Sequence, residues 1–404
     1  MVNMLYYTSD EIKGYISEIR LKLASMGADL TDDKALKTIE DYVFSLEKSR
    51  SCSYSINSDL IQRLFLSLRS EMDILQPYID DRSISEIMVN GKDNIFVERN
   101  GKIEKLPLSF DSTEELEELI RRIASRVHRE INELNPIVDA RLSDGSRVNA
   151  VYKNIALNGP ILTIRKFPER VMTMRDFLLN GTVSPEAADL LKILVVSGFN
   201  CFVCGGTSSG KTTMLNVLAQ LIPPTERVIV IEDSAELQID QIDNIVRMEC
   251  RNAGASGKGA VDMAQLVKAS LRMRPDRLII GEVRGSEAFE MINAMNTGHD
   301  GSLSTGHAGS IKGILKRLES LFIQAADFPV ESIRSQIAEG LDIIIHMNRD
   351  SRGSRRVMEI AELIEVRNGE ITLNYLYTLE DGMTGNRIIH REKLKSAGFD
   401  DLNI

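Results

Sequence analysis

Apolar residues recur at helical spacing through the first part of the chain. In EIRLKLASM and LIQRLFLSLRSEMDIL, apolar side chains recur three or four positions apart, and glycine and proline are almost absent from this part of the chain. This spacing gathers the apolar residues on one face of a helix. Residues 1–75 are therefore predicted to form a small helical region, with a joint near Ser51–Ser58.

The pattern then changes to the alternation that is typical of half-buried strands. EIMVN, NIFVERN and KIEKLPL alternate apolar and polar residues, and Asn100-Gly101 between two of them predicts a type I′ hairpin. Ser112 followed by Glu115 predicts a capping box at a helix start. With a further hairpin in ARLSDGSRVNAV, residues 76–168 are expected to form an α+β domain.

Strand and helix patterns take turns in the rest of the chain. Residues 169–185 are predicted to be a linker, and Ser184-Pro185 then opens a helix with proline at its first position. The βα repeats over 186–404 indicate an α/β fold, a mostly parallel sheet with helices on both faces. After residue 341, added antiparallel strands are predicted from DIIIHMN, RRVMEIAELIEV and EITLNYLY.

The segment GGTSSGKT matches the phosphate-binding pattern G-x-x-x-x-G-K-[ST], with a predicted strand before it and a helix after it. Glycines leave backbone N–H groups free to face phosphate oxygens. Lys211 is expected to reach the β and γ phosphates of ATP, and the Thr212 hydroxyl to bind Mg²⁺. The expected nucleotide-binding residues are Gly205, Gly206, Thr207, Ser208, Ser209, Gly210, Lys211, Thr212 and Thr213.

Two predicted strands, VIVIED and LIIGE, end in acidic residues. Where P-loop hydrolases usually carry Asp-Glu, this chain has Gly281 and Glu282. Because ligands sit at the carboxyl ends of parallel strands, the neighbouring strand can supply the other carboxylate. Glu282 is expected to polarise the attacking water, and Glu232, helped by Asp233, to hold Mg²⁺ or its waters. Asp233 as a helix or turn cap is the alternative.

Two histidines lie on either side of another predicted strand, and two cysteines lie on the predicted strand before the phosphate-binding loop. His299 and His307 are candidates to donate to a phosphate or to sense its loss, with a structural role for one of them as the alternative. A zinc site is disfavoured because no third ligand lies nearby. Cys201 and Cys204, three apart on a strand, should point to opposite faces as buried thiols.

The net charge and the number of cysteines bear on the binding partners and the cellular compartment that we expect. The formal net charge is −10, which does not suggest binding to nucleic acid or anionic lipid. Four cysteines in 404 residues fit a reducing compartment. We expect neither a signal peptide nor a membrane-spanning segment, so that any role at a membrane would come through partners.

The motifs GGTSSGKT, IEDSAEL, RPDRLIIGEVRG and AMNTGHDGSLSTGHA together resemble those of the type II and type IV secretion ATPase superfamily. In that superfamily, glycine at position 281 is normal. The resemblance is closest to the CpaF/TadA branch, the motors of tight-adherence (Flp) pili. Two departures are VYKNIALNGP, where the branch often has a proline pair, and Gly306, where bulkier residues are common.

The resemblance implies a RecA-like P-loop ATPase domain joined to an N-terminal α+β (PAS-like) domain in a homo-hexamer. It implies that Arg141, Arg147 and Arg165 reach the phosphates, with Arg272, Arg274 and Arg284 as further candidates. The implied function is a cytoplasmic ATP-driven motor that acts on an inner-membrane platform protein of a pilus. The alternatives are a traffic ATPase of type IV secretion or conjugation, a soluble ATP-binding regulator, and a DNA recombinase or helicase.

Overall fold

The computed structural model describes residues 6–26, 30–127, 129–167, 170–251, 259–350 and 353–399. The chain divides into two units, Met1–Glu169 and Arg170–Ile404. This division lies at the start of the predicted linker, although Pro168 and Glu169 themselves are outside the described residues. Among the described residues, no helix is both long and apolar enough to cross a membrane.

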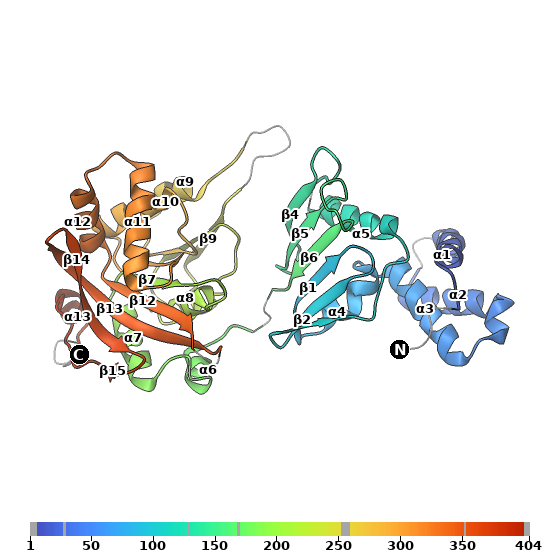
Figure 1. The fold of residues 1–404 in the computed structure, drawn as a ribbon, viewed down its shortest axis with the longest axis horizontal. Coiled ribbons are helices and arrows are strands. Elements are labelled where there is room, and N and C mark those ends of the chain that lie inside the picture. The colour runs from blue at the N-terminus through green and yellow to red at the C-terminus, as the bar shows by residue number, and fades with distance from the viewer. Residues whose placement is uncertain are drawn as a thin grey trace. The chain divides into compact units, whose positions relative to one another are not determined.

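The first unit begins with helices packed on a shared apolar core, as the helical pattern predicts (Figure 1). Threonine or serine side chains cap the start of each long helix. The chain breaks before α3 at residues 52–53, inside the predicted joint, and α3 begins at Tyr54, so the later part of that joint is helical. The elements are α1 (Ser9–Ala24), α2 (Asp32–Ser45), η2 (Lys48–Ser51), α3 (Tyr54–Arg69), η3 (Asp73–Leu75) and α4 (Gln76–Asp80).

An antiparallel sheet of order β3-β2-β1-β6-β5-β4 follows, and α5 packs on one of its faces. Asn100 and Gly101 have φ of 50° and 77°, so the predicted type I′ hairpin is confirmed. The elements are β1 (Ile84–Asn90), β2 (Ile95–Arg99), β3 (Lys102–Lys105), α5 (Thr113–Arg126), β4 (Ile137–Arg141), β5 (Arg147–Val151) and β6 (Ile161–Arg165).

Only half of the predicted capping box forms at the start of α5. The Ser112 hydroxyl accepts from the Glu115 amide. The Glu115 carboxylate instead accepts from the Asp111 amide and contacts the Arg63 guanidinium on α3. The long-range ion pair with Arg63 thus competes with the local capping geometry.

Arg63 joins the helices to the α+β part of the unit. Its guanidinium is only 4% exposed and lies 2.7 Å from Glu115, 3.0 Å from Asp111 and 3.3 Å from Asp73. Burial raises the pKa of Glu115 to about 7, with the charges of Asp73 and Asp111 adding to burial and Arg63 opposing it. Three carboxylates therefore depend on one buried cation.

We expect Arg63→Met to destabilise the first unit by about 3–5 kcal/mol, because removing one partner leaves buried carboxylates without compensation. Hydrogen exchange of the α3 and α5 amides in the full chain measures this loss. Arg69→Met is the matched control, since Arg69 pairs with an exposed Asp32 carboxylate. Equal exchange in the two variants would contradict a structural role for the Arg63 cluster.

The second unit holds a nine-stranded sheet of order β15-β14-β13-β12-β7-β11-β10-β8-β9. Its helices, by chain order, are α6 (Met174–Leu179), α7 (Pro185–Val196), α8 (Lys211–Ala219), α9 (Met263–Ser270), α10 (Glu287–Asn296), α11 (Ile311–Ala325), α12 (Val330–Gly340) and α13 (Glu392–Ser396). Its strands are β7 (Cys201–Gly205), β8 (Val228–Glu232), β9 (Ile245–Glu249), β10 (Arg277–Ile280), β11 (Leu303–His307), β12 (Ile343–Arg349), β13 (Arg355–Arg367), β14 (Glu370–Thr378) and β15 (Gly382–Met383).

Six neighbouring strands of this sheet, β12, β7, β11, β10, β8 and β9, are parallel, which confirms the mostly parallel sheet. Strands β13, β14 and β15 extend the sheet beyond β12 in antiparallel fashion. The prediction that DIIIHMN is antiparallel was wrong in part. It forms β12, which is parallel to β7 and antiparallel only to β13. A crossover through α11 and α12 separates it from β11, and such a crossover returns the chain in the parallel direction.

The predicted linker contains a helix. In α6, Thr173 and Asp176 form a capping box, and Phe177 is buried in the core of the second unit. The 169–185 segment is therefore largely part of that unit. The Ser184 hydroxyl accepts from the Ala187 amide and Pro185 is the first helical residue of α7, as predicted.

Two apolar cores cover the two faces of this sheet. Cys201 belongs to one core and Cys204 to the other, so the predicted opposite orientation is confirmed. Burial raises the pKa of both thiols to about 12. Gly306 on β11 is explained by packing, because a Cβ there would lie 2.9 Å from the Phe202 ring.

Candidate functional site

The P-loop connects the carboxyl end of β7 to the first turn of α8. Ser208 and Gly210 have φ of 57° and 97°, conformations that turn the backbone back on itself. A Cβ at Gly205 would lie 2.4 Å from the Met347 carbonyl of β12. Glycine is thus required where the loop leaves the sheet. The strand–loop–helix context predicted for this motif is present.

Lys211, the first residue of α8, is 7% exposed. Its ammonium donates to the Gly206 carbonyl at 2.8 Å and lies 3.3 Å from His307 Nδ1. Burial lowers the pKa of Lys211, while the Glu282 charge opposes that shift. The lysine is therefore held at the loop in the position that the motif predicts.

His307 and Glu282 meet although 24 residues lie between them in the chain. His307 is the last residue of β11 and Glu282 follows β10, and these strands are parallel neighbours with Ile280 opposite Ser304. The Thr305 hydroxyl donates to the Gly281 carbonyl at 2.7 Å and ties the two strand ends together. His307 Nε2 then lies 3.0 Å from Glu282 Oε1. Lys211, His307 and Glu282 form a continuous row of contacts.

The charges in this row are set by its surroundings. Burial and the Lys211 charge lower the pKa of His307, which favours a neutral ring. Burial would raise the pKa of Glu282, but a 2.7 Å hydrogen bond from Arg284 and the nearby positive charges outweigh it and lower that pKa. Glu282 is accordingly ionised at neutral pH, and a neutral His307 can accept from Lys211 through Nδ1.

Glu232 ends β8, the strand beside β10, and is 3% exposed. Its Oε1 accepts from the amides of Glu236 at 2.8 Å and Leu237 at 3.1 Å. Burial raises its pKa, and these two amides oppose the shift. A Cβ at Gly281 would lie 3.0 Å from Glu232 Cγ. The side chain of Glu232 thus takes the space where an Asp-Glu pair would place the aspartate.

We expect Gly281→Ala to destabilise the second unit by about 1–3 kcal/mol, because the added methyl group overpacks against Glu232. The thermal transition of the full chain without nucleotide measures the effect. Gly309→Ala is the control, since a Cβ at Gly309 has no atom within 4 Å. A Gly281→Ala transition no lower than that of the control would show that Glu232 does not require glycine there.

The remaining predicted residues lie in different places. Asp233 is 70% exposed at its side chain and lies 3.8 Å from Arg284. His299 precedes β11, at the opposite end of that strand from His307, and its Nδ1 lies 3.1 Å from the Ala294 carbonyl of α10. No contact among the described residues links His299 to the P-loop, so its phosphate role stays a prediction.

The three arginines implied by the resemblance lie in the first unit, in one row. Arg141 is paired with Arg147, and Arg147 with Arg165, on β4, β5 and β6. Residues in register on neighbouring strands share a face of the sheet. Because Val148 and Ile164 face the core under α5, the arginines face the other side. Their contact with nucleotide stays a prediction.

Two residues at the P-loop were not predicted. Arg355 Nε donates to the Ser208 carbonyl at 3.1 Å, and Arg349 Nη2 lies 3.5 Å from the same oxygen. They are paired on β12 and β13. About 140 residues separate them from the loop in sequence, and no motif includes them. Only the parallel placement of β12 beside β7 would have indicated them.

The side chains at the loop fit a nucleotide phosphate and Mg²⁺. Ser209 Oγ is buried without a hydrogen-bond partner among the described residues, and the buried Glu282 Oε1 faces His307 Nε2 at 3.0 Å, so both oxygens can still accept from an incoming ligand or water. Thr212 and Thr213 follow Lys211 in the first turn of α8. The described residues contain no group of three or more His, Cys, Asp or Glu able to hold a metal alone. A magnesium ion would accordingly depend on hydroxyl, phosphate and water oxygens as well.

Comparisons with known proteins identify the family to which this nucleotide site belongs. A family model described as "Type II/IV secretion system protein" matches residues 69–371. A putative conjugal transfer protein of Mycobacterium tuberculosis is 30% identical over 329 residues, covering 80% of this chain and 93% of that protein. The type IV secretion system protein PtlH of Bordetella pertussis is 32% identical over 318 residues, covering 72% and 93%.

The solved structure of the Legionella pneumophila ATPase DotB shares the mixed α/β fold. It is 19% identical, with a TM-score of 0.52, over 72% of this chain and 80% of that chain. The family match includes the P-loop, both acidic strand ends and His307 in the second unit, together with most of the first unit. The chain therefore belongs to the type II/IV secretion system ATPase superfamily.

Proposed function

We propose that the second unit hydrolyses ATP with Mg²⁺ and that the chain is the motor of a pilus or secretion machine. The observation that carries this proposal is the row Lys211–His307–Glu282 at the carboxyl edge of the sheet. A buried lysine, a neutral histidine and an ionised carboxylate side by side at a P-loop suit attack on a phosphate by water.

Each residue in the row has a separate role in this proposal. Lys211 binds the β and γ phosphates, and Thr212 with Glu232 and Asp233 holds Mg²⁺ or its waters. Bound Mg²⁺ would neutralise phosphate charge. Glu282 orients and polarises the attacking water with its carboxylate, whose buried Oε1 lies 3.0 Å from His307 Nε2. Its lowered pKa favours this orienting role over removal of a proton in the ground state.

His307 lies between the lysine and the carboxylate, so it can register the loss of the γ phosphate. Lys211 Nζ lies 3.3 Å from His307 Nδ1. When Lys211 turns to a phosphate, this contact weakens, and His307 Nδ1 can donate to the same phosphate once it carries a proton. His307 thus couples nucleotide state to the position of Glu282.

We propose further that the chain works as a homo-hexamer in which Arg141, Arg147 and Arg165 contact nucleotide phosphates. The support is the alignment of these arginines in one row on the sheet face opposite α5. Guanidinium groups match phosphate geometry and can stabilise the charge that develops during transfer. The ring would act at the inner face of the cell membrane through a platform protein, without binding nucleic acid directly.

The machine that the motor serves has two candidates. The motif resemblance favours a motor of a Tad/Flp-type pilus. The names of the relatives, a conjugal transfer protein and a type IV secretion protein, favour a traffic ATPase of secretion or conjugation at least as well. Both candidates use the same ATP site.

Replacing the chromosomal gene with its Glu282→Gln form separates the two candidates. A pilus motor predicts loss of surface pili, counted by electron microscopy, with normal transfer of DNA and effector proteins. A traffic ATPase predicts loss of transfer with normal pilus number. A strain unchanged in both would contradict the motor proposal, provided immunoblots show equal protein levels.

A further inference from the structure

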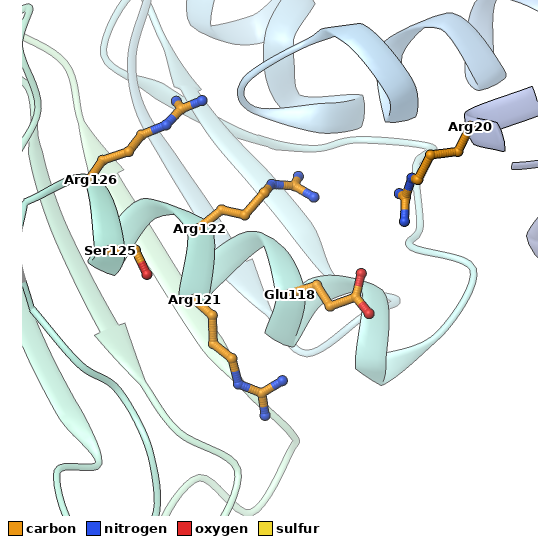
Figure 2. A pocket seen from close by; sticks show the side chains of 6 residues that line it. All are labelled: Arg20, Glu118, Arg121, Arg122, Ser125 and Arg126. Carbon is orange, nitrogen blue, oxygen red and sulfur yellow. The ribbon is translucent and has the colours of Figure 1, made fainter. Parts of the chain in front are cut away.

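A second charged site lies in the first unit, between α1 and α5. An open cleft of about 510 Å³ is lined by Arg20, Glu118, Arg121, Arg122, Ser125 and Arg126. Figure 2 shows Arg20 reaching from its own helix toward α5, where Arg122 and Glu118 point back toward it. Arg121 points to a different side (Figure 2). The cleft thus receives cationic groups from two helices.

Helical spacing produces the cationic side of this cleft. Glu118, Arg122 and Ser125 are separated by four and three residues on α5, so they share one face of that helix. Arg126 follows one turn after Arg122. With Arg20 from α1, four guanidinium groups and one carboxylate line the cleft, in a chain whose net charge is −10. Such a local excess of positive charge attracts anions.

Several guanidinium groups of the cleft lack a full set of hydrogen-bond or ion-pair partners among the described residues. Arg122 Nη2 is buried without a hydrogen-bond partner among the described residues, and it lies 3.7 Å from the Asp73 carboxylate. No acidic partner of Arg20 is found in the part of the chain that the structure describes. Arg126 pairs with Glu71, but both side chains are exposed, so that pair is easily exchanged for a ligand.

Arg121 differs from the other three arginines. Its guanidinium donates to the Tyr152 hydroxyl at 2.8 Å and to Glu117 at 3.0 Å. It therefore serves to position α5 on the sheet. The donors available to a ligand are those of Arg20, Arg122 and Arg126, with Glu118 and Ser125 able to contact a polar, uncharged part of the ligand.

We propose that this cleft binds a phosphate-bearing small molecule of about nucleotide size, at a site separate from the P-loop. Guanidinium groups pair with phosphate oxygens through two parallel hydrogen bonds, and three of them can surround a di- or triphosphate. The cleft volume lies within the usual range for small-molecule sites, about 300–1,000 Å³. A ligand held by both α1 and α5 would fix the N-terminal helices on the α+β domain.

The test measures binding of radiolabelled pyrophosphate by equilibrium dialysis. The full chain carries Lys211→Ala, so that the P-loop contributes little, and the buffer contains no magnesium. We expect one pyrophosphate per chain. The pair Arg20→Gln and Arg122→Gln should weaken binding at least about tenfold, since charge-assisted hydrogen bonds are lost. Arg50→Gln, an exposed arginine on η2, is the matched control.

Arg20→Gln alone is a variant that should fold normally, because the Arg20 side chain is exposed. It should weaken binding severalfold with an unchanged circular dichroism spectrum. Absence of pyrophosphate binding, or equal binding by the Arg20/Arg122 variant, would overturn the proposal. So would binding of a glutamate-rich peptide that pyrophosphate does not displace, which would assign the cleft to an acidic protein segment.

Discussion

Replacing Glu282 with glutamine should stop ATP turnover while nucleotide binding remains. Glutamine has the same shape, so the packing beside Gly281 and His307 is kept. The ionised oxygen that polarises water is lost, and we expect turnover to fall at least about a hundredfold. Steady-state phosphate release measures turnover, and calorimetric titration with ADP measures binding.

Glu290→Gln is the control for this substitution. Glu290 on α10 is similarly buried, with 14% exposure of its side chain against 19% for Glu282, and it also pairs with a cation, Lys268. Glu290 makes no contact with the P-loop among the described residues, so the Glu290→Gln variant should hydrolyse ATP at the rate of the unmodified chain. If the Glu282→Gln variant turned over ATP within a few fold of the rate of the unmodified chain, Glu282 would not be the catalytic carboxylate and Glu232 would be the leading candidate for that role.

Replacing Lys211 with alanine should weaken ADP binding by about ten- to a hundredfold, the usual effect of losing a hydrogen bond from a charged donor. The lysine is buried and already desolvated, so little further desolvation opposes its contact with phosphate. Calorimetric titration with ADP measures the change.

Lys268→Ala serves as the control, because Lys268 on α9 is exposed and pairs only with Glu290 among the described contacts. It should bind ADP as the unmodified chain does. Unchanged affinity in the Lys211→Ala variant would place the phosphates elsewhere than at the P-loop.

The core of the candidate site could be predicted from sequence because it depends on strand ends. A P-loop marks the end of one parallel strand, and acids at the ends of β8 and β10 must lie at the same edge. The same reasoning explains Gly281, since Glu232 on the neighbouring strand fills the space beside it. These inferences need only the direction of the strands.

Other features of the site and fold depend on contacts between distant parts of the chain and could not be predicted from the local sequence pattern. His299 and His307 look equivalent in sequence, yet β11 separates them, and only His307 meets Lys211. Arg349 and Arg355 reach the P-loop only because β12 returns beside β7. Arg63 redirects Glu115 away from its predicted capping bond. In each instance, a tertiary contact decided what the local pattern left open.

The central claim is that this chain hydrolyses ATP at the P-loop of its second unit in an assembled ring. The most direct measurement is phosphate release from the purified chain with Mg-ATP at several protein concentrations, with Lys211→Ala in parallel. We predict release that rises more than proportionally with concentration and is lost in the variant. Equal release by the Lys211→Ala variant, or none by the unmodified chain at any concentration, would contradict the claim.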